Sequence, residues 1–332
     1  MERAVINSDL KKHEIQPEHL LKGYHSLIEE DIQNLLPGNL LKPSLCPVSN
    51  EKDTRDSFFK LGMKYQVSQS LGNIYLSPRP SVEDLKQFYL QSKGRHFWLT
   101  ELWPKTKNIR AEKIILPQLE WVQGFMDQYG SARSAKIGEF LPNHWGYAEE
   151  VERVLPIVDY HLVDPLFNAD LGSGFKEIYT SVSLPESCFD AVLLFEALDR
   201  TVNPRELLEC VKNLLKSGGL CFMTCLLASG FEVQVLGSES GIFVPPERMN
   251  LLSLEGMNDL IEKIGGFEVI EFSTPGVLDI PNVISKLNEI KNSSFYDYLF
   301  NQRRDQTLVE SFQDFLQINC LGTFGRLVLK KK

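Results

Sequence analysis

The sequence predicts an α/β protein built on an open, largely parallel sheet. The clearest signal lies in residues 189–227, where an apolar run is followed by a helical pattern that begins at Pro204 and by a second apolar run at 220–227. A strand, a helix and a strand joined by short turns form a crossover, and crossovers connect parallel strands. The same alternation starts at Ala135 and continues toward the end of the chain, which is why we predict a whole sheet of this kind.

The residues before Ala135 predict smaller units. Residues 1–45 carry an apolar stripe at helical spacing, and Pro37-Gly38 ends it. Residues 46–92 read as a strand-rich module that finishes in a helix with Ser81 at its N-cap. Another amphipathic helix is expected from Asn108 to about Tyr129.

The remaining elements follow in order. Strands are expected at 135–140, 160–164, 176–182, 191–195, 220–227, 267–272 and 325–329. Helices are expected at 147–154, 204–215, 254–264, 283–299 and 307–318. Gly218-Gly219 and Gly265-Gly266 are interpreted as helix stops. We therefore divide the chain into an N-terminal helical segment (1–45), a small module (46–92) and an α/β domain (93–332).

Composition excludes several classes of function. The chain has 332 residues, 43% of them hydrophobic, and a net charge of −9, so a broad nucleic-acid footprint is not expected. No apolar run approaches the ~18 residues of a membrane span, and the first residues lack a signal-peptide pattern. Six cysteines show no spacing typical of disulfides. We expect a cytoplasmic protein.

These residues resemble class I S-adenosylmethionine-dependent methyltransferases. The stretches that carry the resemblance are 189–224, with its acidic loop, Pro-led helix and Gly-Gly turn, then 245–253 and 265–269, and the module 46–80. Among these methyltransferases, the sequence resembles most specifically the subfamily with an N-terminal zinc-ribbon-like module. This subfamily is associated with sugar or surface-polysaccharide modification. The resemblance implies a Rossmann-like sheet with flanking helices, S-adenosylmethionine as cofactor and a small acceptor such as a sugar or nucleotide-sugar.

The resemblance also implies which residues hold the cofactor. They follow three neighbouring strands: Glu139, Asn143, Gly146, Asp164, Phe195 and Glu196. Asp164 stands where the family binds the ribose hydroxyls, and ionised acceptors strengthen such bonds. The glycine-rich first turn of the family is here 139–146, in which only Gly146 remains, and Asn143 is a partial substitute because Asn tolerates left-handed backbone.

Other family positions are altered. Thr180-Ser181 stand where relatives place an adenine-binding Asp. Arg200 and Arg248 replace two histidines, and arginine cannot act as a base at neutral pH. The pair is suited to clamping a diphosphate, although we favour ordinary surface positions for both. His144 lies in the altered first turn, but without an identified partner it does not name the base, which stays unknown.

The family's zinc ligands are almost all replaced. Cys46 remains, whereas Ser49, Ser68 and Leu71 occupy the other three positions. Tetrahedral zinc takes four thiolate or imidazole ligands, so we predict no metal in the module.

Two further hypotheses compete with a methyltransferase. The accumulated losses favour, as an alternative, a catalytically inactive protein of the same fold that binds or assembles with a protein partner. A nicotinamide-dependent oxidoreductase ranks lower, because Gly172-Ser-Gly174 follows the second strand and lacks the third glycine of the dinucleotide motif.

Overall fold

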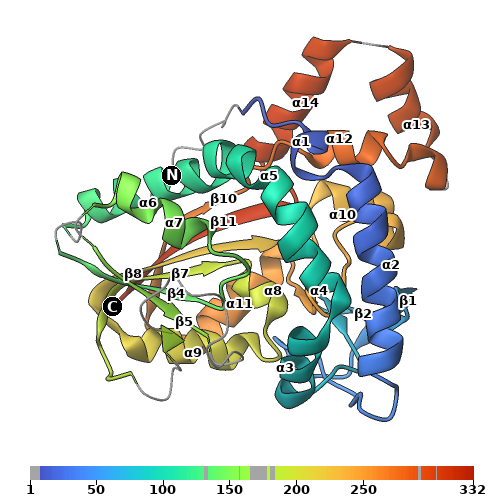
Figure 1. Cartoon of the computed structure of the whole chain (residues 1–332). Coiled ribbons are helices and arrows are strands. Elements are labelled where there is room, and N and C mark those ends of the chain that lie inside the picture. Colours follow the sequence, from blue (N-terminus) through green and yellow to red (C-terminus); the bar gives the residue numbers. More distant parts are fainter. Residues whose placement is uncertain are drawn as a thin grey trace.

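The chain folds around two sheets, a large one in the α/β domain and a small one beside it (Figure 1). The computed structural model describes residues 8–130, 134–156, 158–164, 178–179, 184–290, 293–303 and 305–332. The predicted adenine-side pair Thr180-Ser181 and the Gly172-Ser-Gly174 motif lie outside these residues.

The large sheet has seven strands within the described ranges. They are β4 (Lys136–Phe140), β5 (Asp159–Val163), β6 (Ile178–Tyr179), β7 (Phe189–Phe195), β8 (Leu215–Leu226), β10 (Phe267–Ser273) and β11 (Phe324–Lys331). Their spatial order is β10-β11-β8-β7-β4-β5-β6. The pairs from β6 to β8 are parallel, while β11 lies between β8 and β10 and is antiparallel to both. The first five strands thus have the doubly wound order 3-2-1-4-5, and the predicted Rossmann-like fold class is confirmed.

Both faces of this sheet are buried, as the apolar runs of its central strands require. Val192 and Leu194 of β7 join the core beneath helices α9 (Pro204–Leu214) and α11 (Leu254–Ile264). Leu193 points to the other core, which α6 (Leu116–Gln128) and α7 (Gly146–Val154) cover (Figure 1). The order in which strands are added to the sheet reverses between β4 and β7, so a ligand of an open α/β sheet is expected at this point.

The N-terminal units pack on the edge of this domain. Their elements are α1 (Lys12–Ile15), α2 (Glu18–Leu35), β1 (Thr54–Lys60), β2 (Met63–Ser68), β3 (Ile74–Leu76) and α3 (Val82–Gln91). The small sheet has the order β1-β2-β3-β9, and β9 (Asn250–Leu251) belongs to the α/β domain. The strand-rich module therefore shares its sheet with a segment nearly 160 residues later in the chain.

The helical elements between the module and β4 follow one another without a break. They are α4 (Lys93–Phe97), the π-helical turn η1 (Trp98–Leu102), α5 (Trp103–Arg110), the π-helical turn η2 (Ala111–Ile115) and α6. The helix predicted to start at Asn108 thus begins earlier, and Pro104 lies inside this continuous helix, just after the π-helical turn η1.

One sequence prediction about a helix end is wrong. Helix α9 ends at Leu214, and Gly218-Gly219 lies inside β8 instead of stopping the helix. Gly218 has φ +77°, and the pairing of β7 with β8 shifts register between Phe189 and Ala191. The glycine pair therefore serves an irregular start of the strand, where a left-handed residue is needed.

The expected helix at 283–299 is also wrong, because this part of the chain is broken into short pieces. They are α12 (Asp279–Ile284), η5 (Leu287–Glu289), α13 (Ser294–Asp297) and η6 (Tyr298–Gln302), before α14 (Gln306–Ile318). They share an apolar cluster with α10 (Phe231–Leu236), which the short η4 (Gly237–Glu239) follows, and α12, α13 and α14 lie at the upper right of Figure 1. Leu236, Val283 and Leu316 belong to the separate apolar cluster of this region. No helix in the described ranges is long and apolar enough to span a membrane.

Candidate functional site

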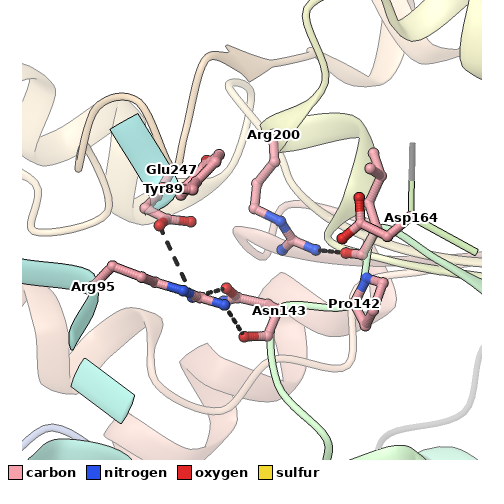
Figure 2. A pocket seen from close by; sticks show the side chains of 8 residues that line it. Tyr89, Arg95, Pro142, Asn143, Asp164, Arg200 and Glu247 are labelled. Carbon is pink, nitrogen blue, oxygen red and sulfur yellow. Dashed lines mark hydrogen bonds and ion pairs between the residues drawn. The ribbon is translucent and has the colours of Figure 1, made fainter. Parts of the chain in front are cut away.

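A hollow lies at the carboxyl ends of the central strands, next to the point where the sheet order reverses (Figure 2). Its cavity volume is about 20 Å³, roughly the room of one water molecule, and the hollow opens to solvent. The lining residues come from the N-terminal helices, from the turns after β4, β5 and β7, and from the loop before β9: Tyr89, Arg95, Leu141, Pro142, Asn143, Asp164, Arg200 and Glu247. Of the six residues predicted to hold a cofactor, Asn143 and Asp164 are in this lining.

The turn after β4 keeps a left-handed residue, but not the one expected. Leu141 has φ +51°, whereas Asn143 is not among the residues with positive φ. A left-handed leucine costs roughly 1–2 kcal/mol. Its side chain is only 5% exposed and joins the core, and its N–H donates to Val163 O at 2.9 Å. The prediction that Asn143 supplies this geometry is therefore wrong, and burial of the leucine side chain offsets the strain.

Two arginines hold this turn instead of glycines. Arg95, from α4, donates to Asn143 Oδ1 at 2.6 Å and to Asn143 O at 2.7 Å (Figure 2). Arg200, from α8 (Ala197–Arg200), donates through Nη2 to Leu141 O. Charge-assisted bonds of this kind are strong. The turn where the family brings backbone close to its cofactor is thus fixed by the protein's own side chains.

Asp164 follows β5 directly and is 1% exposed. Its place in the sheet was predicted from the strand pattern, since parallel strand ends meet at one edge. Among the predicted cofactor residues it is the one acid that the hollow exposes to a ligand.

Glu139 lies one residue before the end of β4 and is 2% exposed. It accepts a hydrogen bond from the Tyr160 hydroxyl at 2.7 Å and does not line the hollow. Burial raises the pKa of Glu139 to about 7, although Tyr160 and Arg200 favour the ionised form. Its protonation therefore changes near neutral pH.

Gly146 is required by helix packing. A Cβ at this position would lie 2.9 Å from Trp103 Cη2 and 3.0 Å from His144 Nδ1, both tighter than ordinary contacts. The His144 ring stacks on Trp103 at 4.2 Å and on Tyr147 at 5.4 Å between ring centroids. Burial, with the Arg110 charge, lowers the pKa of His144 to about 3. His144 is therefore neutral at pH 7 and packs with aromatic rings next to α7.

Phe195 and Glu196, at the end of β7, also lie outside the hollow's lining. Phe195 packs on Tyr147 with ring centroids 4.4 Å apart. Glu196 adopts φ +54° and pairs with Arg248, which also lies 3.4 Å from Asp199 Oδ2. Burial raises the pKa of Asp199 to about 7, against the attraction of Arg248.

The interpretation of Arg200 and Arg248 as surface residues is wrong. Arg200 is 5% exposed, and the Arg248 side chain is 17% exposed. Burial alone would lower the pKa of Arg248, but Glu196 and Asp199 raise it above its usual range. Because Arg248 is engaged by two acids and is absent from the hollow's lining, the two arginines do not form the diphosphate clamp in this structure.

The positions of the family's zinc ligands carry hydrogen bonds. Asn73 Nδ2 donates to Cys46 Sγ at 3.6 Å, and Ser68 Oγ donates to Asp53 Oδ2 at 3.4 Å. Within the described residues, no three His, Cys, Asp or Glu side chains are grouped so that they could hold a metal. The module also packs against the α/β domain, where β3 pairs with β9.

Tyr89, Arg95 and Glu247 were missed by the sequence analysis. Glu247 belongs to the Pro245–Ser253 stretch that carries the resemblance, so its segment was recognised but its side chain was not. Tyr89 and Arg95 lie in helices with no local signal for a ligand.

Comparisons with known proteins give only distant matches. No protein-family model matches the sequence, and no curated protein does so either. Among solved structures, a Haemonchus contortus phosphoethanolamine N-methyltransferase in complex with S-adenosyl-L-methionine is 12% identical over 83% of this chain and 71% of its own, with a TM-score of 0.42. An S-adenosylmethionine-dependent methyltransferase from Archaeoglobus fulgidus is 14% identical over 64% of this chain and 94% of its own, with a TM-score of 0.37. The fold assignment rests on the strand order of the sheet.

Proposed function

We propose that this protein is an S-adenosylmethionine-dependent methyltransferase acting on a small acceptor. The observation that carries the proposal is the position of Asp164, a buried acid at the end of β5 that meets the turn after β4 in one hollow. The hollow lies where the sheet order reverses, which is the ligand position of open α/β sheets.

The residues present fit the cofactor in part. Asp164 would accept hydrogen bonds from the ribose hydroxyls, and Asn143 lies beside it in the lining. The turn 141–146 fits less well, because Arg95 and Arg200 already bind its carbonyl groups. When bound, the cofactor supplies an activated methyl group. The contribution of the chain is to orient the acceptor toward it and to exclude water.

The acceptor class comes from the sequence resemblance, which implies a sugar or nucleotide-sugar. Arg200 and Arg248 do not form the clamp that would bind the diphosphate of a nucleotide-sugar, because Arg248 pairs with Glu196 and Asp199. A sugar without a diphosphate is therefore the simpler form of this proposal.

A second candidate is a catalytically inactive protein of the same fold that serves as a binding or assembly partner. The arginine contacts at Leu141 and Asn143 favour it, because they fill hydrogen-bond acceptors of the turn nearest to the expected cofactor. In that reading these contacts are permanent and stabilise the fold.

Calorimetric titration with S-adenosylmethionine and S-adenosylhomocysteine separates the two candidates. Micromolar binding that falls at least tenfold in Asp164→Asn supports the methyltransferase, because the ribose would lose a charged acceptor. Asp159→Asn, at the opposite end of β5 and with a carboxylate 64% exposed, is the matched control and should bind like the wild type. Absence of heat up to millimolar ligand would refute cofactor binding and leave the assembly partner.

A further inference from the structure

Two buried, charged side chains of the hollow have unused hydrogen-bonding capacity. Arg200 is 5% exposed, and its Nη1 finds no acceptor among the described residues. Glu247 is 7% exposed, and neither of its carboxylate oxygens accepts a hydrogen bond from the part of the chain that the structure describes. Leaving buried charges without partners is costly, so a ligand that supplies the missing partners gains affinity.

The neighbouring charges meet this need in part, because Arg95 pairs with Glu247 by charge but donates no hydrogen bond to it. Arg95 Nη1 lies 4.0 Å from Glu247 Oε1, which is too long for a hydrogen bond, and both terminal nitrogens of Arg95 already donate to Asn143. Arg248, the next residue after Glu247, pairs with Glu196 and Asp199. Figure 2 shows Glu247 and Arg200 approaching the same hollow from different segments.

The charges of the lining select the kind of ligand. Arg95 and Arg200 are balanced by Asp164 and Glu247. A phosphate alone would be attracted by Arg200 but repelled by Glu247. An amine alone would be attracted by Glu247 but repelled by Arg200. A group with both charges on a short spacer satisfies both residues at once.

We infer that the hollow binds a zwitterionic group whose ammonium donates to the Glu247 carboxylate and whose carboxylate or phosphate accepts from Arg200 Nη1. The inference rests on the proposed function only in naming where such a group comes from. It is either the amino-acid end of the cofactor or a zwitterionic acceptor molecule. The chemistry that Arg200 and Glu247 recognise is the same in both cases.

Five probes in calorimetry distinguish these sources. S-adenosylhomocysteine carries a zwitterionic end, and 5′-methylthioadenosine is the same nucleoside without it. O-phosphoethanolamine is a small free zwitterion, and inorganic phosphate with ethanolamine, each alone, supplies its separate charges. The variant is Glu247→Gln, which keeps the shape and removes the charge. Glu268→Gln, exposed on β10 at the far edge of the sheet, is the matched control.

If the cofactor's end is the ligand, S-adenosylhomocysteine binds about tenfold to a hundredfold more tightly than 5′-methylthioadenosine. Glu247→Gln then removes most of that difference and leaves 5′-methylthioadenosine unaffected. If the acceptor is the ligand, O-phosphoethanolamine binds, its separate charges do not, and Glu247→Gln abolishes binding.

The inference is overturned if zwitterions bind no better than their partial counterparts, or if Glu247→Gln leaves the preference intact; water then satisfies both side chains. Equal binding of both nucleosides, without phosphoethanolamine binding, would overturn the inference while the proposed function stands. If O-phosphoethanolamine binds and neither nucleoside does, the proposed function is overturned while the inference stands.

Discussion

Glu139 and Asp199 are two buried carboxylic acids near the ends of the central strands. They are 2% and 1% exposed, and burial raises the pKa of each to about 7. A hydrogen bond from Tyr160 to Glu139 and the charge of Arg248 near Asp199 stabilise the ionised forms, but they offset only part of the cost of burial. Single residues at the strand ends thus make the charge of this region depend on pH in the neutral range.

Glu139→Gln should flatten the dependence of the unfolding free energy on pH. The pKa of Glu139 is about 7 in the folded protein against an ordinary 4.5, so its stabilisation is complete below pH 4.5 and is lost as pH rises toward 7. At about 1.4 kcal/mol per pKa unit, the loss amounts to about 3 kcal/mol at most, and the variant should not show it. Urea unfolding across this pH range measures the effect. Exposed Glu268→Gln should behave like the wild type, and an unchanged slope in Glu139→Gln would contradict the assignment.

At the scale of elements, the ends of helices depend on their caps. Ser81 Oγ accepts from Asp84 N, and the Asp84 carboxylate accepts from Ser81 N, so α3 begins at the predicted N-cap Ser81 with a capping box. Helix α3 brings Tyr89 to the hollow, so this cap also positions part of the candidate site.

Ser81→Ala should destabilise the protein by about 1 kcal/mol, since it removes a side-chain cap. Ser293→Ala is a suitable control, because Ser293 is the N-cap of α13 without a side-chain cap hydrogen bond, and it should change stability by less than about 0.5 kcal/mol. Chemical denaturation measures both. Equal effects of the two changes would mean that the cap of α3 contributes nothing.

Local sequence signals predicted most elements because their causes are local. Apolar spacing and the Ser253 cap place α11 at 254–264 as expected, and Gly265 ends it with φ +62°. The failures have non-local causes. Gly218-Gly219 was interpreted as a helix stop, but Leu215 and Leu220 on either side of the pair are held by β7, so the glycines lie in the irregular start of β8. The 283–299 pattern is interrupted because its apolar residues join a cluster with α10 and α14.

The candidate site follows the same division. Asp164 and Asn143 were predictable because they follow parallel strands, and the strand order brings those ends together. Arg95 and Glu247 reach the hollow from a helix before the sheet and from a loop after β8, so only the tertiary structure reveals them.

At the scale of the whole molecule, the small module and the α/β domain are joined by buried hydrogen bonds. Asn73, fully buried, accepts from Ser253 N at 2.8 Å through Oδ1 and donates to Cys46 through Nδ2. Tyr65 donates its hydroxyl to Arg248 O at 2.6 Å. The bonds of Asn73 with Ser253 and of Tyr65 with Arg248 join the module to the segments on either side of β9, and Arg248 follows Glu247 directly.

Asn73→Ala should lower the unfolding free energy by about 1–3 kcal/mol, because it leaves buried partners without hydrogen bonds. If the module and the domain unfold as one unit, tryptophan fluorescence and far-UV circular dichroism will give coincident transitions in wild type and variant. Asn319→Ala, an exposed position whose side chain donates to Phe315 O at 2.8 Å, serves as control and should shift stability by less than about 0.5 kcal/mol. Separate transitions would show that the module folds independently.

The shared small sheet has a consequence for how the chain can be shortened. β9 pairs with β3, and Phe243 packs its ring against Tyr65 at 5.2 Å and Phe58 at 5.0 Å. A protein that began at residue 93 would lose Phe58 and Tyr65, expose Phe243 and leave β9 without its neighbour, and such exposed edges and apolar side chains promote aggregation. We therefore expect that the α/β domain does not fold properly without the first 92 residues, because the loop with Glu247 packs against them.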